Sequence, residues 1–236
     1  MKLNTIAAIA RTATFAAVAS ALALGLASGA DAATGTMYGD PAAAAKWWRH
    51  QQYDDCVLMS SADVVGQVTG KEPSEGAIIK VAQTTPSTVH PGSIYVKPAN
   101  KKNPNSGMGT SLRDVPTLLA HYGVDAKMTD ADHAERTGIP TGMESLEHFL
   151  GSGHKVIVSL NAEMIWHQPV EEKDEKGNPV SDHAVVVTGV DTANGVVHLN
   201  DSGTPDGRDE QIPMALFAKA WATSHNFMVI TTGTGN

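Results

Sequence analysis

The chain contains a single cysteine, Cys56, in the stretch YDDCVLMSS. One cysteine cannot form an internal disulfide, so its thiol is an inert buried group, an intermolecular bridge or a nucleophile. The apolar pattern that follows predicts a helix over residues 56–67, with Asp54 and Asp55 as N-cap residues and a stop at Gly70. Cys56 then lies in the first turn, where unpaired N–H groups and the helix dipole stabilise a thiolate, although the two aspartates oppose this effect.

A nucleophilic thiol needs a base and a group that orients the base. The second informative stretch, SDHAVVVTGVDTANGVVHLNDSG, contains His183 and Asp201. Its valine-rich runs predict two strands, residues 184–190 and 196–200, joined by a turn that contains Asn194 and Gly195. This pattern is typical of a β-hairpin that presents an imidazole near one end and a carboxylate just after its second strand.

The register of the hairpin decides whether these two side chains meet. With a five-residue loop, residues 191–195, Val185 faces Asp201, and His183 lies on the same sheet face, one diagonal step away. A four-residue loop shifts the pairing by one residue and puts the two side chains on opposite faces. Asn200 is a rival orienting group, and the alternation of strand residues favours Asp201.

Six stretches occur in a characteristic order: DDCVLMSSADVVGQVTGKEPSE, GTSLRDVPTLLAHYGVDA, GHKVIVSLNAEMIW, DHAVVVTGVD, VHLNDSG and FAKAWATSHNFMVITT. In this order they resemble papain-like cysteine peptidases of the bacteriocin-leader-processing (double-glycine peptidase) type, in particular the secreted single-domain branch. The resemblance extends from Trp47 to Thr232, and the DHAV and LNDSG pair is its most specific part.

The resemblance implies an α+β, papain-like fold, in which a helix led by the cysteine packs on an antiparallel sheet that carries the histidine. It implies Cys56 as nucleophile, His183 as general base and later general acid, and Asp201 as the residue that orients the imidazole. A peptide or protein substrate is expected, and no cofactor. The other histidines show no short ligand spacing such as H-E-x-x-H, so the sequence indicates no metal site.

The chain departs from the family pattern at two positions. Val57 follows the cysteine where family members commonly have glycine, which predicts a narrower site. The glutamine that donates to the oxyanion usually stands six residues before the cysteine, and that position is His50. Gln51 and Gln52 are the candidates for this role; we favour Gln51, with a solvated surface position as the alternative for both.

Trp166 follows the predicted strand 156–160. The resemblance implies that this tryptophan forms a wall of the substrate site, and ordinary core packing is the alternative. The loop 90–110 is expected to border the groove, and the charged segment 171–179 to form a solvated flap before the histidine. Further helices are predicted from near Ser74, over 111–122 and over 143–150.

The first 32 residues have the layout of a secretory signal peptide: two basic residues, an apolar run and a small-residue triplet that ends at Ala32. A retained membrane anchor is the alternative. Residues 33–236 are then long enough for one domain. With 17 Lys and Arg against 25 Asp and Glu, the net charge of −8 argues against nucleic acid or anionic lipid as the main partner.

The sequence therefore predicts a secreted or cell-envelope cysteine peptidase that hydrolyses a peptide or amide bond, with no stable membrane insertion after signal cleavage. Two alternatives stay open: a cell-wall peptide amidase or endopeptidase with the same nucleophile and base, and a non-catalytic peptide-binding module on the same scaffold. The sequence does not specify the substrate or the oligomeric state.

Overall fold

The computed structural model describes residues 35–100 and 106–233. These residues belong to one compact unit, Thr34–Asn236. The predicted signal peptide, residues 1–32, lies outside the described residues.

The helix that begins at the cysteine is the central helix of the fold. It is α2, Cys56–Thr69, and it ends at Gly70, whose φ of 72° is the left-handed conformation that glycine adopts freely. Asp55 holds the N-cap position, but its carboxylate makes no capping hydrogen bond, so only the position of the predicted cap is correct. Leu58 packs towards α3, Glu75–Thr84, and Val57 on another face packs towards the sheet.

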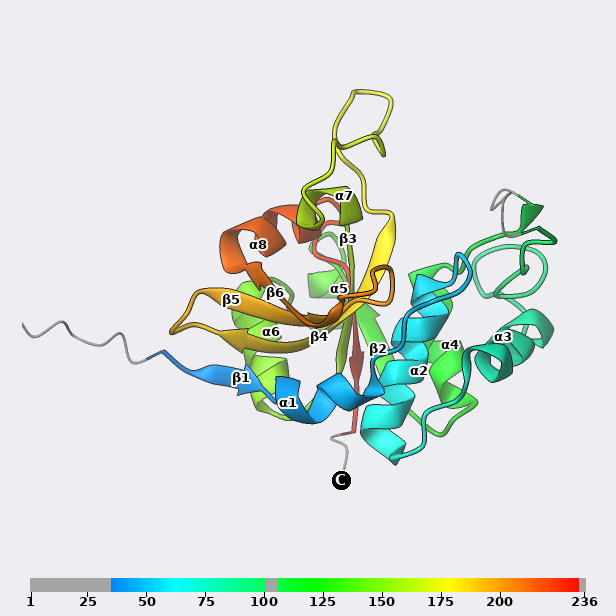
Figure 1. Cartoon of the computed structure of the whole chain (residues 1–236), viewed down its shortest axis with the longest axis horizontal. Helices are drawn as coiled ribbons and strands as arrows, with labels where there is room; N and C mark the ends of the chain where they lie inside the picture. Colours follow the sequence, from blue (N-terminus) through cyan, green and yellow to red (C-terminus); the bar gives the residue numbers. More distant parts are fainter. Residues whose placement is uncertain (1–34, 101–105, 234–236) are drawn as a thin grey trace, which may run out of the picture. The chain divides into compact units, whose positions relative to one another are not determined.

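The sheet has seven strands, and every pair that it forms is antiparallel. Its main path runs β2-β7-β3-β4-β5-β6, while β1 pairs with β4 (Figure 1). The strands are β1 Met37–Gly39, β2 Ala126–Thr129, β3 Val156–Leu160, β4 His183–Asp191, β5 Val196–Asn200, β6 Arg208–Pro213 and β7 Met228–Thr231. The strands predicted over 156–160 and 196–200 are confirmed.

Both faces of the sheet are buried, because alternate residues of the central strands face different helices. Val185 and Val187 belong to a cluster with Phe217 of α8, whereas Ala184 and Val186 pack against α2. Figure 1 shows α2, α3 and α4 on one side of the strands and α8 on the other. This arrangement confirms the predicted α+β class and the cysteine-led helix on an antiparallel sheet.

The remaining helices are short. They are α1 Pro41–Ala44, α4 Val115–Ala120, α5 Ala134–Thr137, α6 Met143–Gly151, α7 Ala162–Ile165 and α8 Met214–Ala222, with 3-10 helices at Ala45–Trp47 and Leu112–Asp114. The helix predicted over 111–122 is thus split into a 3-10 turn and α4, since Pro116 begins a new helical segment. Within residues 35–100 and 106–233, no helix combines the length and the hydropathy needed to cross a membrane.

The β4–β5 hairpin differs from its prediction near the turn and agrees with it at the site. Asp191 pairs with Val196, so the loop has four residues rather than five. A β-bulge between Val187 and Gly189 then shifts the register by one residue, and Val186 pairs with Asn200. The pairing of Val186 with Asn200 is the one that a five-residue loop would give. The predicted loop was one residue too long, and the bulge shifts the strands by one residue, so the register at the site is as predicted.

A buried polar link joins α2 to the second strand of this hairpin. Asp63 is 3% exposed and accepts hydrogen bonds from Gln67 Nε2 at 2.6 Å and from Asn200 Nδ2 at 2.7 Å. Asn200 Nδ2 donates a second bond to Ala44 O at 3.0 Å. Burial raises the pKa of Asp63 to about 7. Asn200 is therefore turned towards α2.

Replacing Asp63 with alanine should lower the free energy of unfolding by about 1–3 kcal/mol, because one buried N–H of Asn200 loses its acceptor. Asp63 holds a proton that the unfolded chain lacks between its ordinary pKa of 3.8 and about 7. The contribution of Asp63 to the free energy of unfolding therefore falls as the pH rises from 3.8 to about 7. The loss of stability caused by Asp63→Ala should become smaller over the same pH range. Urea denaturation at several pH values measures both effects. Glu172→Ala, in the exposed flap, is the control and should change stability by less than about 0.5 kcal/mol.

Candidate active site

Cys56 and His183 meet where α2 packs on β4. His183 begins β4 and is 6% exposed, while the thiol at the start of α2 is partly buried. The two side chains line the same cavity, and the charge of Cys56 contributes to the raised pKa of His183. Packing of the two elements holds this contact: Val57 lies in one cluster with Ala184, and Ser60 Oγ donates to the carbonyl oxygen of Ala184 at 3.2 Å.

Asp201 completes a series of hydrogen bonds behind the imidazole. His183 Nε2 lies 2.6 Å from Asp201 Oδ1, so the pair predicted from the hairpin is brought together. Asp201 is fully buried, and its carboxylate accepts two further bonds: Gly203 N to Oδ1 at 2.7 Å and Trp166 Nε1 to Oδ2 at 2.8 Å. Because Nε2 is bonded to Asp201, the nitrogen that faces the thiol is Nδ1.

The pKa values of His183 and Asp201 are shifted in opposite directions, and each shift favours the charged form. Burial lowers the pKa of His183, but the charge of Cys56 and the hydrogen bond to Asp201 outweigh it, so the pKa lies well above the ordinary value. Burial acts against ionisation of Asp201, yet the bond from His183 prevails and the pKa of that carboxyl is lowered. Both directions favour an imidazolium bonded to a carboxylate.

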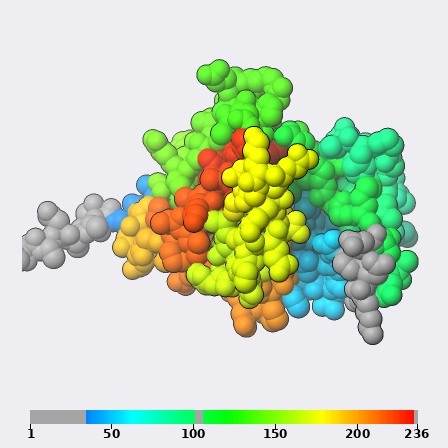
Figure 2. All heavy atoms as spheres, turned by 90° about the horizontal axis from the view of Figure 1, so that it is seen from above, coloured from blue at the N-terminus to red at the C-terminus, as the bar shows by residue number. Residues whose placement is uncertain are grey.

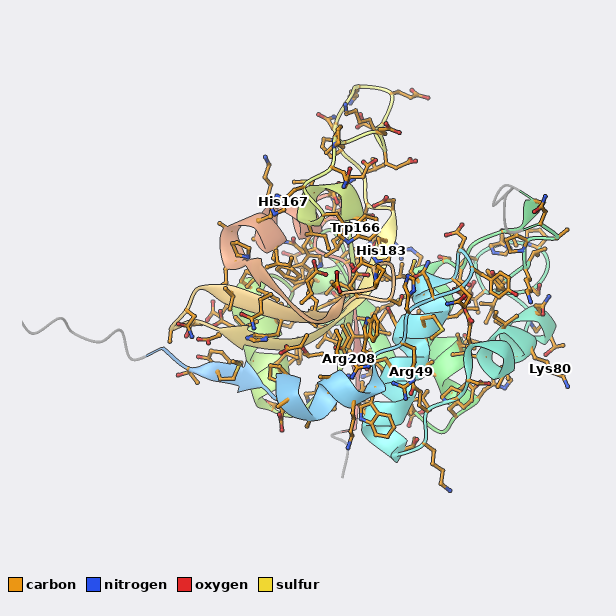
Figure 3. The ribbon with its side chains drawn as sticks, in the orientation of Figure 1. Arg49, Lys80, Trp166, His167, His183 and Arg208 are labelled. Atoms are coloured by element: carbon orange, nitrogen blue, oxygen red, sulfur yellow. The ribbon has the colours of Figure 1, made fainter. Side chains whose placement is uncertain are left out.

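Trp166 lies against the histidine and the aspartate. Its ring centroid is 5.2 Å from that of His183 at an angle of 59°, and Figure 3 shows the two side chains next to each other. Gly203 makes this possible, because a Cβ there would stand 2.8 Å from Trp166 and 2.9 Å from the imidazole. The substrate-wall role of Trp166 stays a prediction; what the structure describes is a donor to Asp201.

The two candidate glutamines differ in their surroundings. Gln51 is partly buried: its Oε1 accepts from Ser202 Oγ at 2.8 Å, and its Nε2 donates to Tyr53 O at 2.9 Å. Gln52 is exposed, and its backbone N donates to Glu75. The loop after Asp201 therefore holds the Gln51 amide in one orientation, although Gln51 is not among the residues that line the cavity at Cys56.

Asn200, the rival of Asp201, does not reach the imidazole. Its amide is bonded to Asp63 and Ala44 on the side of α2. Of the two candidates, Asp201 is the one whose side chain is hydrogen-bonded to His183.

A cavity of about 260 Å³ opens in front of Cys56 and His183. Residues 109–112 form part of its wall, so the loop that precedes α4 borders it as expected. A second hollow of about 230 Å³ shares Ser159 and Ser181 with this cavity and extends to Phe227. The two hollows adjoin, because they share wall residues, and together we call them the groove.

The charged segment 171–179 is exposed along its whole length, as predicted. It projects from the fold between α7 and β4, and its atoms, yellow in Figure 2, stand on the face seen there. Within the described part of the chain, no group of three or more His, Cys, Asp or Glu side chains is placed to hold a metal ion.

Sequence reasoning missed three features of the site. The LNDSG motif contains Ser202 and Gly203, but their roles were not predicted. Ser202 bonds to the Gln51 side chain, and Gly203 leaves room for the rings of Trp166 and His183. Asp55 was assigned to the N-cap, yet it is 2% exposed and lines the cavity. Asp182, next to the histidine, also lines the cavity.

Comparison with known proteins identifies relatives over most of the chain. The model of the Peptidase_C39 like family matches residues 51–228. Uncharacterized proteins of Mycobacterium bovis and Mycobacterium tuberculosis are 75% identical over 232 residues, which cover 98% of this chain and 100% of each relative.

One solved structure shows the same fold, and a second is more distantly similar. A crystal structure described as that of a C39-like peptidase from Bacillus anthracis covers 85% of this chain and 100% of its own, with a TM-score of 0.52 and 16% identity. A double glycine motif protease from an AMS/PCAT transporter, in complex with the leader peptide, covers 78% and 88% with a TM-score of 0.42 and 15% identity. With α2 led by Cys56 on the antiparallel sheet, the first likeness confirms the papain-like fold.

Replacing Trp166 with phenylalanine keeps a ring beside His183 and removes the N–H that Asp201 accepts. We expect the free energy of unfolding at neutral pH to fall by about 1–3 kcal/mol, because a buried carboxylate oxygen loses its donor. The lowered pKa of Asp201 should return towards its ordinary value. The ionised Asp201 carboxylate stabilises the folded protein, and this effect is lost as the pH falls through the folded pKa. In Trp166→Phe the loss should therefore occur at a higher pH than in the wild-type protein.

Chemical denaturation from about pH 3 to about pH 7 measures both changes. Trp47→Phe is the matched control, since that ring lies against Gly66 on α2 and not at the site. Equal stability profiles of the two variants would contradict a role of Trp166 in holding Asp201.

Proposed function

The chain belongs to the Peptidase_C39 like family, and from this premise we propose that it is a secreted cysteine peptidase that hydrolyses a peptide or amide bond. One observation carries the proposal. Cys56 and His183 line one cavity, and the imidazole is hydrogen-bonded on its other side to the buried carboxylate of Asp201.

In the proposed reaction the Cys56 thiolate attacks the substrate carbonyl, and a tetrahedral oxyanion forms. His183, protonated on Nδ1, gives its proton to the leaving amine, and an acyl-enzyme remains. The imidazole then takes a proton from water, whose hydroxyl displaces the thiolate. Asp201 stays ionised throughout and keeps the ring in the orientation that presents Nδ1 to the thiol.

The oxyanion needs donors that are already aimed at it. We assign this role to the backbone N–H of Cys56 and to the side chain of Gln51. An amide nitrogen carries two N–H groups, so the bond from Nε2 to Tyr53 O uses only one of them. The bond from Ser202 to Oε1 supports the assignment, because it prevents the amide from turning its oxygen towards the substrate.

The groove supports a peptide rather than a compact metabolite as substrate. The cavity at Cys56 adjoins a second hollow through Ser159 and Ser181, and the two together suit an extended chain. The apolar segment over residues 12–27 and the small-residue triplet after it support export, and we propose a secreted or cell-envelope location.

The first test is the pH dependence of Cys56 alkylation by iodoacetamide, beside the variant His183→Ala. An ordinary cysteine becomes reactive as it ionises near pH 8.5. We expect the wild-type protein to react fully at mildly acidic pH and the variant to follow the ordinary profile, because the imidazolium that stabilises the thiolate is gone. His154→Ala is the control, since that histidine lies in other cavities, and it should keep the wild-type profile.

A slow thiol that is indifferent to His183 would mean that the scaffold binds peptides without cleaving them. Activity itself is read from a peptide library by mass spectrometry: new chain ends should form with the wild-type protein and be absent with Cys56→Ala.

Gln51→Ala should lower the turnover rate by about 10² to 10³, the usual cost of losing one oxyanion donor. Alkylation by iodoacetamide, which forms no oxyanion, should stay within about twofold of the wild-type rate. Gln52→Ala is the matched control, because that side chain is exposed, and its turnover should be unchanged. An equal loss in both variants would remove Gln51 from the oxyanion site.

A further inference from the structure

Asp55 is a buried carboxylate that the proposed mechanism does not use. It precedes the nucleophile, it is 2% exposed, and neither of its oxygens makes a hydrogen bond of good geometry among the described residues, although the Glu75 carboxyl and the backbone of Tyr53 lie near enough to act on its pKa. It lines the same cavity as Cys56 and His183. Burying a carboxyl group without donors costs free energy, so a donor supplied from the cavity would stabilise it.

The surroundings of Asp55 are acidic. Asp54 and Asp182 also line the cavity, and no Lys or Arg does so among the described residues. Burial, and then the charge of Glu75, raise the pKa of Asp55 to about 7. Burial also raises the pKa of Asp182. Among the described lining residues the imidazolium of His183 is the cationic group, and its charge is offset by the Asp201 carboxylate bonded to it. The acidic side chains therefore favour a cation over an anion in the remaining space.

We propose that Asp55 is a substrate-recognition residue, which pairs with a positively charged amine or guanidinium that the substrate carries next to the bond cleaved by Cys56. This inference rests on the proposed function and names its substrate class. The arriving N–H groups would supply well-placed donors to Asp55, and its carboxyl would release its proton to the solvent. Such charge-assisted bonds are about twice as strong as neutral ones.

The size of the cavity limits the cation to one group. A volume of about 260 Å³ is smaller than pockets that enclose whole drug-sized ligands, so it suits one side chain or one chain end. The same chemistry has two sources in a peptide: the side chain of Lys or Arg, or the free amine at the N-terminus.

The lone cysteine allows a test that needs no substrate. Three methanethiosulfonate reagents differ only in the group that they carry: a trimethylammonium, a hydroxyl or a sulfonate. Each transfers its thioalkyl group to the Cys56 thiolate and releases methanesulfinate. Their relative rates report the charge preference of the cavity, because changes in thiolate reactivity cancel in the ratio.

In the wild-type protein the cationic reagent should react fastest and the anionic one slowest. Asp55→Asn should reduce the cation-to-anion ratio by about tenfold, the loss of one charge-assisted contact. Asp54→Asn, which removes the same charge from an exposed neighbour in the same cavity, should reduce the ratio by about twofold at most, as expected for a screened surface charge.

Glu75→Gln is the control for a folding defect in Asp55→Asn. It changes a neighbouring carboxyl group but leaves Asp55 in place, so the preference for the cationic reagent should stay the same or increase. A wild-type ratio near one, or equal losses in Asp55→Asn and Asp54→Asn, would overturn the inference. The test of the cation preference can be separated from the test of the proposed function. If the cavity prefers the cationic reagent but the protein cleaves no peptide, only the proposed peptidase activity is rejected.

Protection of Cys56 from the neutral reagent then identifies the source of the charge. N-acetyl-lysine amide carries only a side-chain amine, glycylglycine amide carries only a terminal amine, and N-acetyl-norleucine amide is neutral. Protection by either cationic compound beyond that of the neutral one supports the inference and names the source. Protection by neither contradicts it.

Discussion

The site depends on one buried carboxylate being fully paired. Asp201 has no exposed surface, and an ionised carboxylate there is tolerated only because three donors reach it, from His183, Gly203 and Trp166. These donors come from β4, from the loop after β5 and from the end of α7. Satisfying one charge therefore draws three distant segments together and leaves the imidazole a single orientation.

The other half of the site depends on packing between α2 and β4. The apolar residues of α2 face both the sheet and α3, so the helix has no freedom to slide or turn. Its first residue, Cys56, is thereby held against His183. The acidic groups nearby have a double effect: Asp55 and Asp182 oppose a thiolate, but they also favour the imidazolium that stabilises it.

Much of this was determined by the sequence alone. Helix α2 was predicted to within two residues at its end, because its apolar pattern and Gly70 act within a few turns of chain. The strands of the hairpin were predicted from valine-rich runs, and the candidate residues Cys56, His183 and Asp201 from their types and order. Local pattern and residue chemistry were sufficient for these features, since each is decided by neighbours in sequence.

Other features were decided only by the tertiary structure. The bulge between Val187 and Gly189 sets the register that lets His183 reach Asp201, and nothing in the turn residues indicated it. The choice between Asn200 and its neighbour depended on which of them found partners on α2. Likewise, Asp55 looked like an exposed cap until the fold enclosed it. In each case the deciding contact joins residues far apart in the chain, so its free energy is absent from any local pattern and exists only once the elements have packed.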